Sequence, residues 1–171
     1  MKFSKKIGIL GGMGPLASSF LYKKIIMQSH NEYGSEQDNE YPEIVLYSIG
    51  LNGFDETGIV DYEKVKQQLI DGVKVLEQAL CDFIIVDCNT VHIFFDDMKN
   101  AVSIPVLHLI EEVVNYVFSI GVKKVGLITS ETTNDLCLYD KKLEEKGLKC
   151  VKLAKSKQKA LNGMILSVCL F

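Results

Sequence analysis

One cysteine stands where an apolar run of the sequence gives way to small polar residues. The run 83–87 reads FIIVD, Cys88, Asn89 and Thr90 follow it, and a helical pattern then continues to Met98. In an α/β protein, catalytic groups gather at the carboxyl ends of parallel strands. The free N–H groups and the dipole at the start of the following helix favour a thiolate over a thiol. We therefore predict that Cys88 is a catalytic base or nucleophile.

Cys88 also has a simpler interpretation, because most cysteines in apolar strands are inert core residues. Cys81 and Cys150 fit that description. Cys88 differs because the backbone N–H groups of Asn89 and Thr90 would form an anion-binding nest beside its sulfur. An anionic group bound in the nest would lie next to the thiolate, which is the layout needed to remove a proton beside a carboxylate.

Two neighbours of Cys88 could take part in its chemistry. His92 could orient or assist the thiol, or it could be a hydrogen-bonded neighbour, and the spacing leaves both interpretations open. Asp87 precedes Cys88 on the predicted strand, so we expect its side chain on the opposite face of the sheet, as a structural hydrogen-bond partner.

A glycine-rich turn follows the first predicted strand. The strand 6–10 reads KIGIL, and the turn 11–15 reads GGMGP. Glycines let the backbone approach a ligand closely, and Pro15 suits the first position of a helix. The turn matches neither a dinucleotide nor a Walker fingerprint, so a tight turn without a ligand is an equal alternative.

Alternating strands and helices must position these groups. The apolar patterns predict, in order, strand 6–10, helix 16–30, strand 43–49, helix 61–80, the strand before Cys88 and its short helix, strand 103–107 and helix 110–120, and then strand 124–129, a polar turn 130–133, helix 134–146, strand 148–153 and helix 155–168. Such alternation predicts parallel sheets with right-handed crossovers. We predict an α/β fold with a complete, doubly wound, four-stranded parallel sheet in a first domain, 1–116. An incomplete second α/β domain, 117–171, would have two strands, so we expect the chain to be cut short there.

Composition excludes several other classes of protein. The 171 residues are 47% hydrophobic with a net charge of −3 and scattered lysines, which argues against nucleic-acid binding. No run of about 18 apolar residues predicts a membrane span. The start of the chain lacks a cleavage-site pattern, and the five cysteines form no CxxC pair, so we expect a cytoplasmic protein with neither a zinc site nor disulfides. Because the chain contains no arginine, any carboxylate must be bound by lysine, backbone N–H groups or neutral side chains.

Four segments, in this order and spacing, resemble the aspartate/glutamate racemase family, in its aspartate racemase-like branch. They read IGILGGMGPL at 7–16, CNTVH at 88–92, SIPVLH at 103–108 and VGLITSETT at 125–133. The resemblance implies two similar α/β domains across a cleft, and a homodimeric amino-acid racemase that needs no pyridoxal phosphate, no metal and no other cofactor. In that family two cysteine thiols flank the substrate α-carbon, and Cys88 would be the first. The positions that would hold the substrate are Met13, Asn89, Thr90, Ser130 and Thr133.

The chain also departs from the family pattern. The second cysteine belongs to a GCTE-like motif that is absent from these residues, and neither Cys137 nor Cys169 has the context to replace it. We therefore expect weak or no racemisation by this chain alone. Two alternatives stay open. One is a one-cysteine decarboxylase or isomerase of the same superfamily, and the other is a non-catalytic remnant that binds a small carboxylate.

The loop 52–57, which reads NGFDET, is a second departure. Some aspartate racemases carry an arginine in this loop for the substrate side chain, and Asn52 is the candidate substrate contact here. Its acidic residues would repel a dicarboxylate if they face the cleft. The predicted substrate is thus a small amino acid or a dicarboxylate, with aspartate in doubt.

Overall fold

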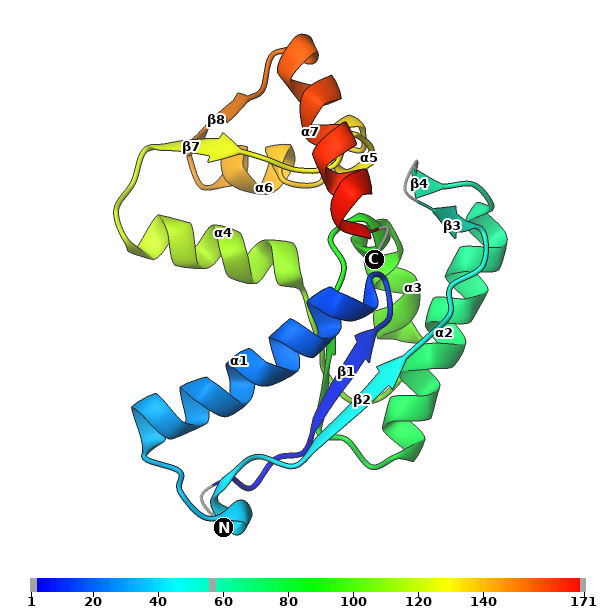
Figure 1. Cartoon of the computed structure of the whole chain (residues 1–171), viewed down its shortest axis with the longest axis vertical. Coiled ribbons are helices and arrows are strands. Elements are labelled where there is room, and N and C mark those ends of the chain that lie inside the picture. Colours follow the sequence, from blue (N-terminus) through cyan, green and yellow to red (C-terminus); the bar gives the residue numbers. More distant parts are fainter. Residues whose placement is uncertain (1–2, 56–57, 170–171) are drawn as a thin grey trace.

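The computed structural model describes residues 3–55 and 58–169, in which strands and helices alternate along the chain (Figure 1). Strands and longer helices run in the order β1 (Ile7–Gly11), α1 (Pro15–Tyr33), β2 (Ile44–Ser48), β3 (Phe54–Asp55), β4 (Gly58–Ile59), α2 (Tyr62–Gln78), β5 (Phe83–Val86), α3 (Phe95–Asn100), β6 (Val106–Leu107), α4 (Leu109–Ser119), β7 (Lys124–Leu127), α5 (Glu131–Asp135), α6 (Asp140–Glu145), β8 (Lys149–Lys152) and α7 (Lys155–Cys169). Short 3₁₀ helices occupy Asp38–Glu40 and Thr90–Phe94. No helix of the described residues is long and apolar enough to cross a membrane.

Four strands form one parallel sheet in the order β2-β1-β5-β6. Helix α1 covers one face of this sheet, while α2 and α3 cover the other (Figure 1). The central strand β1 pairs on both sides, so that Ile9 lies opposite Leu46 on β2 and Ile85 on β5. The prediction of a doubly wound, four-stranded parallel sheet is confirmed.

Helix α2 supplies most of the core on its face of the sheet. Its apolar residues recur at helical spacing, and four of them are fully buried: Val65, Leu69, Val73 and Leu76. Burial of one such side chain contributes about 1.5–3 kcal/mol. Asp61 begins the helix by accepting a hydrogen bond from the N–H of Lys64. At Gly72 a side chain would come 2.7 Å from Leu10, so glycine lets α2 approach β1 closely.

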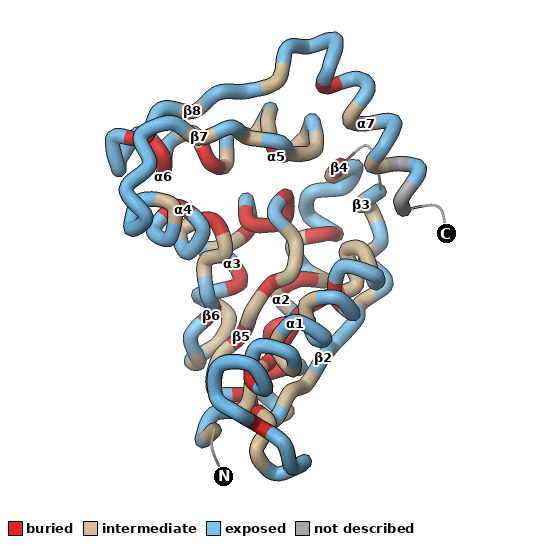
Figure 2. Tube along the Cα trace, turned by 60° about the vertical axis from the view of Figure 1, so that its left-hand side comes forward, coloured by how far each residue is buried: buried red, intermediate tan, exposed pale blue. Residues whose placement is uncertain are grey.

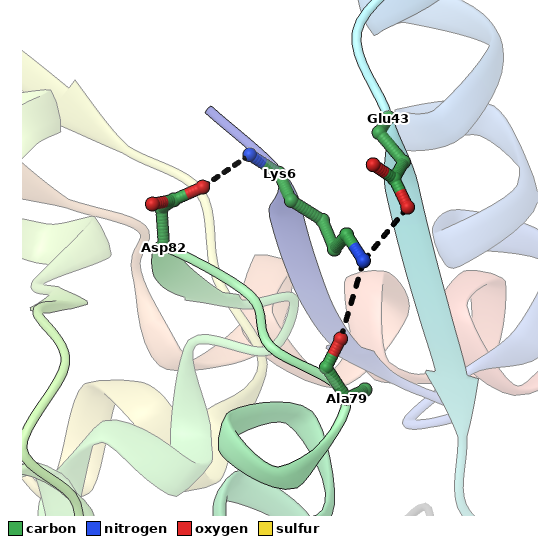
Figure 3. Close-up of polar contacts among 4 residues, drawn as sticks. All are labelled: Lys6, Glu43, Ala79 and Asp82. Carbon is green, nitrogen blue, oxygen red and sulfur yellow. Dashed lines mark hydrogen bonds and ion pairs between the residues drawn. The ribbon is translucent and has the colours of Figure 1, made fainter. Parts of the chain in front are cut away.

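Lys6 joins three elements at the amino end of the sheet (Figure 3). Its Nζ lies 2.7 Å from the Glu43 carboxylate and 3.4 Å from the carbonyl oxygen of Ala79, and its backbone N–H donates to the Asp82 carboxylate. These contacts connect the starts of β1 and β2 with the turn between α2 and β5. They lie at the opposite end of β1 from the glycine-rich turn.

The rest of the chain packs around a second, smaller core. A two-stranded parallel sheet, β7-β8, is surrounded by α4 to α7, and the buried residues there are Ile110, Val114, Tyr139, Leu143 and Leu148. The two cores separate between Val106 and Ile110, since α4 packs in the second one. The boundary that we predicted at 116/117 therefore falls inside α4, and the division into two domains stays a prediction.

Three local predictions were wrong. The helix predicted over 134–146 is two short helices, α5 and α6, because the backbone turns at Cys137, whose φ is 50°. Part of the loop predicted over 50–58 is the hairpin β3–β4, although Glu56 and Thr57 lie outside the described residues. The strand predicted over 103–107 is limited to its last two residues, Val106 and Leu107. Pro105 before them has no N–H to donate, although its carbonyl oxygen still accepts a hydrogen bond from Ile84 of β5.

Candidate active site

A cavity of about 520 Å³ lies between the two cores, beyond the carboxyl ends of β1 and β5. Open parallel sheets bind ligands at this edge. Six of the residues predicted for the site line the cavity together: Met13, Cys88, Asn89, Thr90, Ser130 and Thr133. They come from three separate stretches of the chain, so the fold brings these predicted groups into one place.

Gly11 and Gly12 let the glycine-rich turn pack closely against its neighbours beside the cavity, because a side chain at either position would clash. A side chain at Gly12, whose φ is +96°, would lie 2.2 Å from the carbonyl oxygen of Ile49. A side chain at Gly11 would lie 2.4 Å from Oγ of Ser18, which also accepts a hydrogen bond from the N–H of Gly12. This packing directs Met13 toward the cavity, and it supplies a structural reason for the glycines beside any role in ligand binding.

Cys88 follows the last residue of β5 and precedes the short 3₁₀ helix. Burial raises the pKa of the Cys88 thiol, and the backbone N–H groups of Val91 and Thr90 oppose this with a smaller effect. The carboxylate of Asp87 raises that pKa further. We expected the helix start to lower the pKa, and this was wrong because burial has the larger effect. At neutral pH Cys88 rests as a thiol, which is the proton-donating form.

His92 is buried in the 3₁₀ helix that follows Cys88, and both of its ring nitrogens form hydrogen bonds with the backbone. Its Nδ1 lies 2.7 Å from the carbonyl oxygen of Cys88, and its Nε2 accepts a hydrogen bond from the N–H of Leu109. This pattern assigns the proton to Nδ1 of a neutral ring. Burial lowers the pKa of His92 to about 4. The geometry supports a hydrogen-bonded neighbour that connects the Cys88 loop to α4, rather than a group that acts on the thiol.

Polar side chains connect the two sides of the cavity. Oγ1 of Thr90 lies 2.8 Å from Oγ1 of Thr133, which also accepts a hydrogen bond from the Ser130 hydroxyl. The Tyr139 hydroxyl donates to Oδ1 of Asn89 over 2.5 Å. Because the oxygen of the Asn89 amide is engaged, its NH₂ group is the part that can donate to a ligand.

Asn52, the remaining predicted contact, is not among the residues that line the cavity. Its backbone N–H donates to the side-chain oxygen of Gln68, and its carbonyl oxygen accepts from the nitrogen of the same side chain. The structure therefore joins Asn52 to helix α2. Its role in substrate binding stays a prediction that the geometry does not support.

The cavity also has lining residues that we did not predict. Asp87 lines it together with Cys88, because β5 ends at Val86 and the alternation of strand faces stops there. Burial raises the pKa of Asp87, a hydrogen bond from Ser18 lowers it, and Oδ2 has no hydrogen-bond partner within the described part of the chain. The hydrogen bond with Ser18 on α1 agrees with the expected role of Asp87 as a structural partner, and its place on the opposite face of the sheet from Cys88 stays a prediction. The place of Asp87 directly after an apolar strand was the available signal.

Two further segments close over the cavity. The hairpin β3–β4 contributes Phe54, Asp55 and Gly58, and helix α7 contributes Ile165. A side chain at Gly58 would come 2.3 Å from Oγ1 of Thr132, so glycine allows the hairpin to pack directly on α5. Sequence patterns did not indicate these contacts, because two-residue strands leave no periodicity.

Known proteins resemble the chain over most of its length. The family model described as Asp/Glu/Hydantoin racemase matches residues 10–166. The broad specificity amino-acid racemase RacX of Bacillus subtilis is 32% identical over 162 residues, which cover 95% of this chain and 70% of RacX. A solved aspartate racemase homologue from Pyrococcus horikoshii is 36% identical, with a TM-score of 0.80 over 95% of this chain and 70% of that one. Aspartate racemase from Picrophilus torridus is 22% identical with a TM-score of 0.74, over 96% of this chain and 74% of that one, which supports the fold.

Proposed function

Since the chain belongs to the Asp/Glu/hydantoin racemase family, we propose that it racemises an amino acid, with Cys88 as an acid/base group at the α-carbon. By its family the chain is an amino-acid racemase, an isomerase that works without pyridoxal phosphate. The observation that carries the assignment to Cys88 is its place in the cavity, next to Asn89 and Thr90 and opposite Ser130 and Thr133.

Hydrogen-bond donors around the thiol can stabilise the charge that develops in the reaction. Removal of the α-proton moves negative charge onto the substrate carboxylate, and donors aimed at that carboxylate lower the barrier. The amide of Asn89 and the hydroxyl of Thr90 line the cavity as such donors. The carboxylate bound there would place the α-carbon beside Sγ of Cys88.

Proton transfer at Cys88 accounts for one face of the α-carbon. As a thiolate Cys88 accepts the α-proton, and as a thiol it returns a proton to the carbanion. A proton returned to the same face causes exchange with solvent without inversion, so inversion needs an acid/base group on the other face. Cys88 is the one cysteine among the described residues that line the cavity.

Chiral chromatography of single L-amino acids after incubation with the protein tests the proposal. We expect slow formation of the D-enantiomer with the wild-type protein, because the described cavity wall contains one thiol, and none with Cys88→Ser. The matched control is Cys137→Ser, because Cys137 is exposed and does not line the cavity. Equal rates for Cys88→Ser and the wild type would contradict the role of Cys88.

The single thiol also favours a second candidate, a decarboxylase or cis-trans isomerase that uses one cysteine. Such reactions need one proton donor or one nucleophile, and Cys88 can be either. The discriminating measurement is turnover of an arylmalonate or of maleate. Turnover that is lost in Cys88→Ser, together with no inversion of any amino acid, would favour this candidate over the racemase.

A further inference from the structure

We propose that Cys137 and Cys150 form a thiol pair that a peroxide converts into a reversible disulfide, and that this disulfide loosens the contacts between the smaller core and the Cys88 loop. Both residues are free thiols in this structure, and neither lines the cavity. In a reducing compartment, disulfides of this kind are transient and redox-sensing rather than structural. The proposal concerns a site apart from the cavity and does not depend on the racemase assignment.

The two cysteines lie in neighbouring elements around the smaller core. Cys150 is partly buried on β8 and packs against this core, to which helix α6 contributes Leu143. Helix α6 also packs against β8. Cys137 is exposed in the turn between α5 and α6, so it lies just before the helix that covers Cys150.

Lys152 connects the surroundings of the two thiols. Its side chain lies on the same face of β8 as that of Cys150, because residues two apart on a strand share a face. Its Nζ donates to the carbonyl oxygen of Asn134 over 3.4 Å, and the same oxygen accepts a hydrogen bond of 3.1 Å from the N–H of Cys137. An ion pair of 2.8 Å with Asp140 holds the ammonium group there.

Electrostatic effects agree with this geometry. The pKa of Lys152 is raised mainly by its hydrogen bond with Asp140. Cys137 and Cys150 raise it further through their charge, so both thiols are within electrostatic reach of one ammonium group. Burial and Asp140 raise the pKa of Cys150, while Lys152 lowers it. The exposed Cys137 is therefore the thiol that meets an oxidant first, and the partly buried Cys150 is the one that reacts second.

Oxidation by hydrogen peroxide proceeds in two steps. Thiolates rather than thiols attack a peroxide, and a neighbouring ammonium group stabilises a thiolate. The Cys137 thiolate attacks one oxygen of hydrogen peroxide, so that an S–O bond forms, the O–O bond breaks and hydroxide leaves. Cys150 then loses its proton and attacks the sulfenic sulfur, so that the S–S bond forms and the S–O bond breaks. Two thiols and one hydrogen peroxide thus give one disulfide and two water molecules.

The turn that contains Cys137 also carries contacts to the Cys88 loop. Thr133 before it and Tyr139 after it each form a side-chain hydrogen bond with that loop. A covalent bond from Cys137 to β8 pulls the turn away from the loop, so both hydrogen bonds weaken. Reduction by a small thiol restores them.

Peptide mapping after peroxide treatment tests the thiol pair. The reduced protein is treated with hydrogen peroxide, alkylated, digested and analysed by mass spectrometry, and its free thiols are titrated. We expect a pair of peptides joined through Cys137 and Cys150 and a loss of two thiols per chain, both reversed by dithiothreitol. In Cys150→Ser we expect a sulfenic acid at Cys137 that dimedone traps. The absence of a crosslink between these two cysteines in the wild-type protein would overturn the proposal.

The role of the ammonium group is tested by Lys152→Met. We expect the disulfide to form about threefold more slowly, the range for a partly exposed charge pair. The matched control is Lys149→Met, because Lys149 lies on the same strand with its side chain on the other face, and its rate should equal that of the wild type. An unchanged rate in Lys152→Met would overturn the assignment of Lys152.

Hydrogen exchange measures the effect on the Cys88 loop without relying on catalysis. We expect oxidation to speed the exchange of the amides in 88–92 by about fivefold in the wild type and not in Cys137→Ser. Unchanged exchange in the oxidised wild type would overturn the link to the loop. An equal increase in both proteins would assign the effect to another thiol and would overturn the link as well.

Discussion

The two halves of the molecule that face the cavity differ in how deeply their strands are buried (Figure 2). In the first half, the central strand β1 is buried from Gly8 onward, between helices on both faces of the sheet. In the second half, neither β7 nor β8 contains a buried residue, and the core cluster has five buried side chains among the residues that the structure describes. Cys88 belongs to the well-packed half, while Ser130 and Thr133 belong to the other.

This difference suggests that the first half carries the group for proton transfer and that the second half contributes mainly to substrate binding. Cys88 packs against the main core, which fixes its backbone for proton transfer. The second half reaches the first through a few polar contacts, mainly Thr90 with Thr133 and Asn89 with Tyr139. Elements with few buried contacts open more easily. We therefore expect changes in the second half to alter substrate binding more than proton transfer.

The largest effect should come from a cavity in the main core. We expect Leu69→Ala to lower the free energy of unfolding by about 3–5 kcal/mol, because Leu69 is fully buried between α2 and the sheet. Leu143→Ala, in the smaller core, should cost about 2–3 kcal/mol, because its exposed surroundings can relax around the missing atoms. Urea denaturation measures both values. A larger loss in Leu143→Ala would break the contrast between the halves.

Acid should destabilise the protein through His92, which connects the Cys88 loop to α4. At pH 7 the ring is neutral in the folded and the unfolded chain. As the pH falls below 6.5 the unfolded chain binds a proton, while the folded chain does so only near its pKa of about 4. The free energy of unfolding should therefore fall by about 3 kcal/mol between pH 7 and pH 4 from this group.

The measurement for His92 is urea denaturation at several pH values. The decrease with falling pH should be smaller in His92→Asn, whatever that substitution does to stability at pH 7. His30→Asn is the matched control, because His30 is exposed on α1 and far along the chain from the Cys88 loop. An unchanged pH dependence in His92→Asn would show that the ring is not held neutral.

A smaller effect should follow from Tyr139→Phe, which removes the hydrogen bond from Tyr139 in the second half to Asn89 in the first. The loss of the hydrogen bond to Asn89 should cost about 1 kcal/mol of stability. Because the Asn89 amide loses its orientation, we expect KM to rise by about fivefold with a smaller change in kcat. Tyr116→Phe is the control, since Tyr116 is exposed on α4. A fall in kcat at constant KM would contradict the assignment of substrate binding to this side.

The smallest effect should come from the contacts of Lys6 (Figure 3), which lie at the start of β1, while the cavity lies beyond its carboxyl end. Lys6→Met removes its ion pair with Glu43, and this pair is weak because the Glu43 carboxylate is exposed to solvent. We expect a slightly lower melting temperature at low salt, no difference at high salt, and an unchanged rate of catalysis. A change in kcat would show that contacts at the amino end of β1 affect the geometry of the cavity, which would contradict this prediction.

The sequence predicted the parts of the fold that depend on local patterns. The apolar stripe of α2 and the apolar runs of β1 and β5 were visible, and so was the position of Cys88 after a strand. The hairpin β3–β4 was not visible, because it is held by contact with α5 rather than by its own composition.

Long-range contacts were equally hidden in the sequence. The hydrogen bond between Tyr139 and Asn89 joins residues 50 positions apart, and nothing in the sequence around either residue predicts that the two are in contact. The raised pKa of Cys88 was also missed, because it depends on burial by the whole fold and not on the adjacent helix start. Chemistry at the end of a strand was thus predictable, while its electrostatic environment needed the structure.

Deuterium incorporation at the α-carbon tests the central claim, that Cys88 exchanges a proton with the substrate. The wild-type protein, Cys88→Ser and Cys137→Ser are incubated with amino acids in D₂O, and loss of the α-proton signal is followed by NMR. We predict exchange in the wild type and in Cys137→Ser, and a rate lower by about a thousandfold in Cys88→Ser. Exchange at the wild-type rate in Cys88→Ser would contradict the account.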